Sequence, residues 1–279
     1  MATVVATSAG ADGASFKFLW RGRPGVSYES GFYLYPAYDS VCVSSQAGCN
    51  VGCLFCVTGR SINRYNLAAD EIVAQVTATG ALRRSGLPLK VSFQGMGEPL
   101  HNYASVVAAV RDLRAAGQAD MIGVSTVGFP RLIDRLRTDV PGLKLQISVH
   151  APDDELRHRL IPGSRGTSLA AVLSAAARYG ALAQGDVVFN YVLLAGINDS
   201  PRQAGRLAEL ARPYLPAARV KVSRYNHDPE LPFAASDDAT AAAFVTELRA
   251  RGVPVYEFRS LGVSIASGCG QLRSRAGAS

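Results

Sequence analysis

Short apolar segments alternate with helical patterns along most of this chain, and this alternation limits its fold more than any other feature. Apolar strands are predicted near residues 91–93, 123–125, 145–149, 187–193 and 221–223. Helical patterns are predicted near residues 70–84, 103–116, 130–137, 168–179, 200–212 and 237–251. Strands that alternate with helices form βαβ crossovers, which build a parallel sheet or barrel. The pattern therefore predicts the α/β class.

The first 40 residues follow a different pattern. Residues 1–14 are mostly small or polar, and we expect them to form a disordered leader. Two aromatic, β-rich segments at residues 16–20 and 31–35 flank the turn signal Arg23-Pro24-Gly25. We therefore expect a β-hairpin extension over residues 15–40 and a barrel over residues 41–279.

Size and composition exclude several classes of protein. A chain of 279 residues with 48% hydrophobic residues can bury a core without disulfides or metal. It contains no run close to the roughly 20 apolar residues of a membrane span, and no positive region precedes the apolar residues near its start. These features predict a cytoplasmic protein without a membrane partner. The net charge of +7 is compatible with an anionic partner such as nucleic acid, and equally with a solvated basic surface.

Polar clusters follow the predicted strands where each strand ends. They lie at residues 95–99, 125–128, 148–152 and 198–199, and at Asn226. In folds built from parallel strands, the carboxyl ends of the strands form the ligand site. The sequence therefore predicts a ligand site at this edge.

Cysteine usage points to a metal or redox site. Of the five cysteines, four lie between Cys42 and Cys56 and the fifth is Cys269, a pattern that suits a reducing compartment better than a disulfide framework. Cys49, Cys53 and Cys56 form a CxxxCxxC run whose thiolates can converge on one iron–sulfur cluster and leave one iron open. A zinc knuckle is the alternative, but zinc normally takes a fourth ligand, and no Cys or His follows at the usual spacing.

The CxxxCxxC run resembles the motif of the radical S-adenosylmethionine (SAM) enzymes. The strings CVSSQAGC at 42–49, GMGEP at 95–99, SVHAP at 148–152, ND at 198–199 and CGQL at 269–272 resemble the RlmN/Cfr family of RNA adenine methyltransferases. The likeness runs from about Glu29 to Leu272. It implies a partial (β/α)6 barrel similar to a TIM barrel, a 4Fe-4S cluster and two SAM molecules per turnover.

The resemblance also implies roles for individual residues. Cys49, Cys53 and Cys56 would hold the cluster, whose open iron would bind the amino and carboxylate groups of SAM. The carboxylate of Glu98 is a natural partner for the amino group of SAM. The positions that match SAM contacts of the family are Gly97, Glu98, Ser125, Ser148, Val149, His150 and Asn226.

Three further residues match catalytic positions of the family. Cys269 matches the cysteine that a first SAM methylates, and Cys42 matches the cysteine that resolves the covalent intermediate by forming a transient disulfide. Glu29 matches the proposed general base. A second SAM would give the 5'-deoxyadenosyl radical that removes hydrogen from the S-methyl group. The ordinary interpretations are a buried apolar role for a single cysteine and an exposed hairpin position for Glu29.

Two departures from the family bear on the substrate. Members usually carry a helical N-terminal RNA-binding domain where this chain has a short leader, and commonly an Arg-Gly pair where it has Leu261-Gly262. We expect methylation of an sp2 ring carbon, adenine carbon 2 foremost, in rRNA, tRNA or a small nucleotide-like molecule. A protein such as flavodoxin or ferredoxin would supply the electrons for this reaction. The alternatives are radical methylation of a natural product or peptide, and a non-catalytic iron–sulfur or zinc protein that binds nucleic acid.

Overall fold

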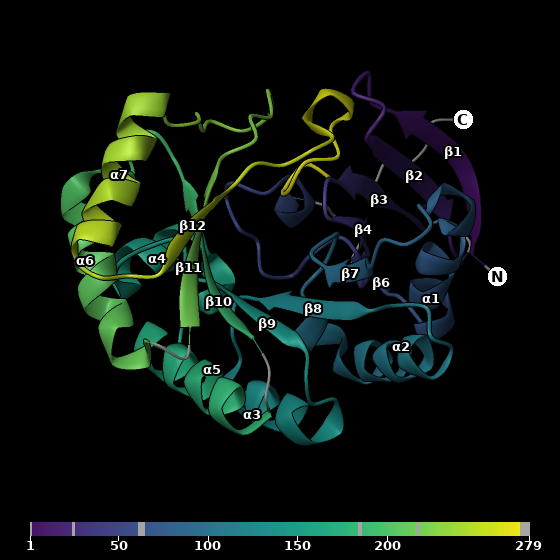
Figure 1. The fold of residues 1–279 in the computed structure, drawn as a ribbon, viewed down its shortest axis with the longest axis horizontal. Coiled ribbons are helices and arrows are strands. Elements are labelled where there is room, and N and C mark those ends of the chain that lie inside the picture. The colour runs from purple at the N-terminus through teal and green to yellow at the C-terminus, as the bar shows by residue number, and fades with distance from the viewer. Residues whose placement is uncertain (1, 24–25, 61–64, 184–185, 216–217, 274–279) are drawn as a thin grey trace. The chain divides into compact units, whose positions relative to one another are not determined.

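The structure is a computed structural model that describes residues 2–23, 26–60, 65–183, 186–215 and 218–273 (Figure 1). The chain divides into two compact units. Unit 1 comprises Met1–Gly52, Cys56–Ser125 and Ser260–Ser279, and unit 2 comprises Cys53–Phe55 and Thr126–Arg259. Within the described ranges, no helix is long and apolar enough to cross a membrane.

Unit 1 contains a mixed sheet. Its strands are β1 (Thr3–Ala9), β2 (Ser15–Arg21), β3 (Ser27–Tyr35), β4 (Tyr38–Cys42), β7 (Leu89–Phe93) and β8 (Met121–Thr126), in this order across the sheet. The pairs β1–β2, β2–β3 and β3–β4 are antiparallel, whereas β4–β7 and β7–β8 are parallel. The sheet therefore changes from hairpin to crossover connections at β4, the strand that ends in Cys42.

The start of the chain differs from the expected disordered leader. Thr3–Ala9 forms β1, which pairs antiparallel with β2, although all of its side chains are exposed. Backbone hydrogen bonds and its β-branched residues favour this edge strand without any burial. The expected pairing of residues 15–40 as antiparallel strands is present, while Pro24 and Gly25 of the turn signal lie outside the described residues.

Helices and short turns complete unit 1. Helices α1 (Ala69–Thr77) and α2 (Tyr103–Ala115) pack against each other, and β5 (Gln46–Ala47) pairs with β6 (Tyr65–Asn66). The 3-10 turns are η1 (Val57–Arg60), η2 (Gly80–Leu82), η3 (Pro99–Asn102) and η6 (Val263–Ile265). The predicted helix at 70–84 is shorter than expected, because α1 ends at Thr77 ahead of Thr79 and Gly80, which are weak helix formers.

Unit 2 is a parallel α/β structure. Strands β9 (Lys144–Ser148), β10 (Val187–Leu193), β11 (Ala218–Arg224) and β12 (Val255–Phe258) pair in this order, all parallel. Its helices are α3 (Pro130–Asp139), α4 (Asp154–Leu160), α5 (Leu169–Ala183), α6 (Pro201–Ala211) and α7 (Asp238–Ala250), with the turns η4 (Pro162–Ser164) and η5 (Arg212–Tyr214). Helix α3 packs on α5, and α6 packs on α7.

Two elements of unit 2 were not predicted from the sequence because they are short. Helix α4 has seven residues, most of them charged, and the side chain of Asp153 caps it by accepting a hydrogen bond from the Leu156 N–H at 2.8 Å. Strand β12 has four residues and no fully buried side chain. Neither gives the apolar periodicity on which the prediction depends.

Candidate active site

The turn after β7 is hydrogen-bonded to the segment after β4. The Ser45 N–H donates to the Met96 carbonyl at 2.9 Å, and the Met96 N–H donates to Ser44 Oγ at 2.8 Å. The Glu98 N–H donates to Gln46 Oε1 at 2.8 Å. The motifs at residues 42–49 and 95–99 are therefore parts of one structure in unit 1.

Two glycines of this turn permit the close approach. A Cβ on Gly95 would lie 2.7 Å from the Val43 carbonyl oxygen, and one on Gly97 would lie 2.6 Å from Gln46 Cβ. Gly97 also has φ +102°, which side chains rarely adopt. Only glycine fits both positions without a shift of the neighbouring segment.

Glu98 presents a buried carboxylate at this turn. The residue is 3% exposed, and Oε1 accepts a hydrogen bond from the Leu100 N–H at 2.9 Å, which caps η3 and orients the side chain. A carboxylate has about four acceptor positions, so it can accept from this N–H and from an ammonium group at the same time. Its chemistry agrees with the predicted contact to the amino group of SAM.

The cysteines of the CxxxCxxC run are free thiols of intermediate exposure. Burial raises the pKa of Cys49 to about 12, and the nearby Cys56 and Glu98 add to the rise. Cys53 belongs to unit 2, whereas Cys49 and Cys56 belong to unit 1. Over the described residues, no three His, Cys, Asp or Glu side chains are arranged as a metal site. The donor chemistry, three thiols in one loop, is that of an iron–sulfur ligand set.

The segment that carries Cys269 is hydrogen-bonded to the residues that follow Cys56. The Val57 N–H donates to the Gly270 carbonyl at 2.9 Å, and Thr58 Oγ1 donates to the Leu272 carbonyl at 2.6 Å. Burial raises the pKa of the Cys56 thiol, and the Cys269 thiol adds to this rise. Motifs at opposite ends of the sequence are therefore neighbours in unit 1.

Cys42 and Cys269 share two tyrosine neighbours. Burial raises the pKa of Tyr33 and of Tyr35, and both thiols add to the rise at each tyrosine. The Tyr33 hydroxyl also donates to the Ser267 carbonyl. Cys269 itself is exposed and Cys42 is half-buried, so neither is the buried apolar cysteine of the ordinary interpretation.

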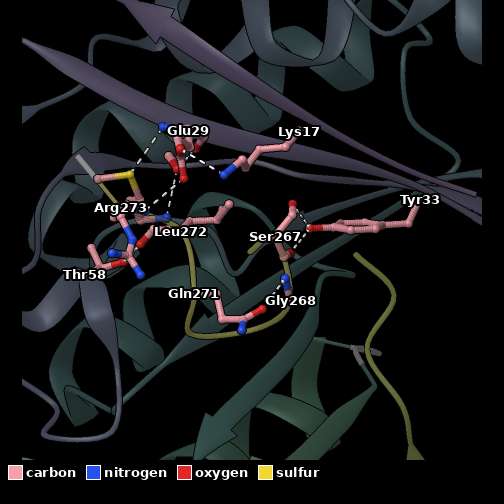
Figure 2. Close-up of polar contacts among 11 residues, drawn as sticks. Lys17, Glu29, Tyr33, Thr58, Ser267, Gly268, Gln271, Leu272 and Arg273 are labelled. Carbon is pink, nitrogen blue, oxygen red and sulfur yellow. Dashed lines mark hydrogen bonds and ion pairs between the residues drawn. The ribbon is translucent and has the colours of Figure 1, made fainter. Parts of the chain in front are cut away.

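Glu29 is buried on β3, not exposed in a hairpin as the alternative interpretation has it. Its side chain is 3% exposed, and Oε1 lies 3.3 Å from Lys17 Nζ. The other oxygen, Oε2, accepts a hydrogen bond from the Arg273 N–H at 3.0 Å (Figure 2). The Glu29 N–H contacts the Met96 sulfur at 3.3 Å. Glu29 thus connects the Cys269 segment to the turn after β7.

In unit 2, His150 follows β9, and its ring packs against Phe55, which lies between Cys53 and Cys56. Its backbone has φ +55°, and its Nδ1 accepts a hydrogen bond from the Val192 N–H at 3.1 Å. Its ring lies 5.1 Å from that of Phe55, edge to face. Burial lowers the pKa of His150 to about 3, with further lowering by Arg157 and Lys221. The ring is therefore neutral, and because Nδ1 is an acceptor, Nε2 carries the proton.

The remaining predicted SAM contacts lie at strand ends in both units. Ser125 is half-buried near the end of β8 in unit 1. In unit 2, Ser148 is half-buried at the end of β9, and the Val149 N–H donates to the Asn190 carbonyl at 3.0 Å. Asn226 is half-buried two residues after β11. Each position agrees with the rule that ligand sites form at carboxyl ends of parallel strands.

Several residues of the site were not anticipated from the sequence. They are Lys17, Tyr33, Thr58 and Arg273, which hold Glu29 or the Cys269 segment. Each contact except Lys17–Glu29 joins residues more than 200 positions apart, so no local pattern could reveal it. Lys17 lies two residues from Leu19, the register partner of Glu29. This contact follows from the register of the β2–β3 pair, which the sequence pattern did not specify.

Comparison with known proteins identifies the family. Residues 43–207 match the radical SAM superfamily. The chain is 39% identical over 275 residues to the probable dual-specificity RNA methyltransferase RlmN of Mycolicibacterium paratuberculosis, covering 95% of this chain and 76% of that protein. The chain belongs to the RlmN family of radical SAM methyltransferases. The probable RlmN of Salinispora tropica is also 39% identical, over 95% of this chain and 74% of its own length.

Solved structures agree with this assignment. A radical SAM methyltransferase from Sphaerobacter thermophilus matches with a TM-score of 0.90 and 37% identity, over 98% of this chain and 81% of that one. A spore photoproduct lyase variant shares the fold alone, with a TM-score of 0.58 and 15% identity over 81% of this chain and 78% of that one. The predicted radical SAM fold and methyltransferase class are confirmed, and the non-catalytic alternative is set aside.

Proposed function

We propose that the chain methylates an sp2 ring carbon of RNA, adenine carbon 2 foremost, through a methylated Cys269 and a transient disulfide with Cys42. The observation that carries this proposal is that β3 contacts both cysteine segments: Gly31 of β3 is the register partner of Cys42, and the Tyr33 hydroxyl donates to the carbonyl of Ser267, two residues before Cys269. The names of the RlmN relatives, which are RNA methyltransferases, support RNA as the substrate.

The family implies a 4Fe-4S cluster and SAM, and the donor groups of this chain suit both. Cys49, Cys53 and Cys56 would hold the cluster. The SAM contacts would be Gly97, Glu98, Ser125, Ser148, Val149, His150 and Asn226. When bound, and reduced by a donor such as flavodoxin or ferredoxin, the cluster supplies the electron that cleaves SAM to a 5'-deoxyadenosyl radical.

The cysteines and Glu29 would carry the methyl group and the protons. The Cys269 thiolate would attack the methyl carbon of SAM, so that a new carbon–sulfur bond forms, the sulfonium–methyl bond breaks, and S-adenosylhomocysteine leaves. After one hydrogen atom is removed from this methyl group, its carbon adds to adenine carbon 2, which lies between two nitrogens and is too poor a nucleophile for polar transfer. The adduct would give up its unpaired electron, for which the oxidised cluster would be the acceptor, and Glu29 would take the ring proton. Cys42 would then attack the Cys269 sulfur, so that a disulfide forms, the sulfur–carbon bond breaks, and the released carbon takes a proton from solvent. A reductant then reopens the disulfide.

A natural-product or peptide substrate remains the second candidate. The feature that favours it is Leu261-Gly262, where the family commonly has an arginine that could contact phosphate. In this case the same cysteines would carry the methyl group, and only the acceptor would differ.

Isotope labelling tests the proposal. The anaerobically reconstituted protein is mixed with trideuteromethyl SAM, a reductant and unmodified rRNA and tRNA, and the nucleosides are analysed by mass spectrometry. Methyladenosine that retains two deuteriums and one ordinary hydrogen is expected, since one deuterium leaves with the 5'-deoxyadenosyl radical. A product with three deuteriums would overturn the Cys269 route.

Cysteine variants provide the controls. C269A is expected to give no methyladenosine and no labelled peptide at residue 269. C42A is expected to stop after carbon–carbon bond formation and to leave RNA attached to Cys269. Labelled Cys269 and 5'-deoxyadenosine without any labelled nucleoside would refute RNA as the substrate and favour the second candidate.

A further inference from the structure

The backbone around Cys269 is fixed on both sides, while Cys269 itself is exposed. Tyr33 donates to the Ser267 carbonyl before it, and the Val57 N–H donates to the Gly270 carbonyl after it. Further along, the Arg273 N–H donates to Glu29 Oε2 at 3.0 Å (Figure 2). A nucleophile presented from a fixed backbone reacts faster than one on a mobile segment.

The Glu29 carboxylate also contacts a charged residue on β2. Lys17 on β2 places its ammonium 3.3 Å from Glu29 Oε1, and the two side chains are 12% and 3% exposed. Leu19 is the register partner of Glu29, so Lys17 is its diagonal neighbour on the same face of the sheet. The ammonium and the Arg273 N–H therefore contact different oxygens of one buried carboxylate.

We propose that Lys17 is a positioning residue for methyl transfer, because it holds the Glu29 carboxylate where it fixes the Cys269 segment. The inference rests on the proposed function, which makes Cys269 the methyl carrier. It adds a residue that acts through its contact with Glu29.

Loss of Lys17 removes the charge that compensates the buried carboxylate. A buried carboxylate without a partner turns toward water or takes up a proton. Either change weakens the acceptor for the Arg273 N–H. The Cys269 segment would then lose this attachment to β3 and keep the one that Tyr33 makes to Ser267. Less methylated product would then form for each 5'-deoxyadenosyl radical.

The test compares K17M with K17R and with the control K144M. Lys144 pairs with Asp186 at 3.0 Å, but these side chains are 27% and 40% exposed, so K144M removes a lysine from a surface ion pair in unit 2. The reconstituted enzymes receive SAM, dithionite and RNA, and methylated nucleoside is measured per 5'-deoxyadenosine formed. K17M is expected to lower this ratio about tenfold while 5'-deoxyadenosine formation stays within about twofold. K17R and K144M are expected to keep the wild-type ratio.

Hydrogen exchange provides a readout that does not need turnover. The Arg273 amide is expected to exchange faster in K17M than in the wild type, and at the wild-type rate in K17R and K144M. If K17M does not fold, K17Q replaces it, because its amide can donate to Glu29 without carrying the charge.

Each outcome decides the inference. An unchanged ratio and unchanged Arg273 exchange in K17M would overturn it, as would equal losses of both products that K17R does not rescue. If the wild type yields 5'-deoxyadenosine but neither labelled Cys269 nor a methylated product, the proposed function fails. The exchange data would then still show whether Lys17 fixes the segment.

Discussion

His150 combines a left-handed backbone with a buried ring whose Nδ1 accepts the Val192 N–H. Asn tolerates this backbone better than most residues and offers a side-chain oxygen in place of Nδ1. We therefore expect the free energy of unfolding of H150N, measured in urea, to be close to that of the wild type. H150A leaves the Val192 N–H without its acceptor and is expected to lower the free energy of unfolding by about 1–3 kcal/mol. Equal losses in both variants would contradict this role of Nδ1.

The lowered pKa of His150 also predicts how stability depends on pH. The folded pKa of about 3 lies below the ordinary value of 6.5, so the unfolded chain binds a proton at this residue first as the pH falls. The contribution of neutral His150 to stability is complete above about pH 6.5 and decreases as the pH falls toward 3. Nuclear magnetic resonance of the ring nitrogens should show one neutral tautomer from pH 5 to 8. A titration midpoint near 6.5 would contradict the prediction.

A pair of glycine-to-alanine substitutions tests whether Gly97 is needed for close packing and not only for its positive φ. Gly97 and Gly117 both have positive φ, but a Cβ on Gly117 would meet nothing within 4 Å. G117A is expected to cost about 1 kcal/mol from backbone strain alone. G97A adds a clash with the Gln46 backbone nitrogen at 2.8 Å, so it should cost more and weaken SAM binding. Denaturant unfolding and equilibrium SAM binding measure both effects, and equal costs would refute the close-packing argument.

At the scale of elements, a part-buried ion pair fixes β4 to the segment that precedes β7. Asp39 on β4 is 1% exposed at its side chain, and its two oxygens accept from the Arg84 N–H at 2.7 Å and from Arg84 Nε at 2.8 Å. The Arg84 side chain is 37% exposed and can reach water. Water can therefore solvate Arg84 if Asp39 is lost, whereas it cannot reach Asp39 if Arg84 is lost.

Removal of Arg84 is therefore expected to be the more damaging change. R84M removes the guanidinium and leaves the buried carboxylate with the backbone N–H of residue 84, so we expect a loss of about 3 kcal/mol in the free energy of unfolding. D39N leaves an arginine that water can solvate, so a loss of about 1–2 kcal/mol is expected. Urea unfolding of both variants gives the order, and a larger loss in D39N would contradict the argument.

At the scale of the whole molecule, the net charge of +7 predicts how activity depends on salt. If RNA is the substrate, each phosphate contact releases a counterion, so kcat/KM should fall as salt increases. For about three phosphate contacts, the loss between 50 and 200 mM salt is roughly 20- to 40-fold. 5'-Deoxyadenosine formation without RNA should change little. A flat salt profile of RNA methylation would indicate a substrate without a phosphate backbone.

Local patterns in the sequence determined the elements and the motifs of this protein. The alternation of apolar strands and helices predicted β7 to β11 and most helices, because period and turn residues are properties of neighbouring residues. The CxxxCxxC run and the strings around Cys42, Gly97, His150 and Cys269 identified the family. Short or exposed elements such as β1, α4 and β12 gave no such periodicity and were not anticipated.

Only the tertiary structure decided which distant residues meet. It placed Cys269 beside the residues that follow Cys56, buried Glu29 between Lys17 and Arg273, and made His150 neutral through burial. Burial and long-range contacts depend on how elements pack, and the same residue types in another packing would be solvated surface groups. The sequence alone therefore supplied the candidate reactive residues, whereas packing set their partners and protonation.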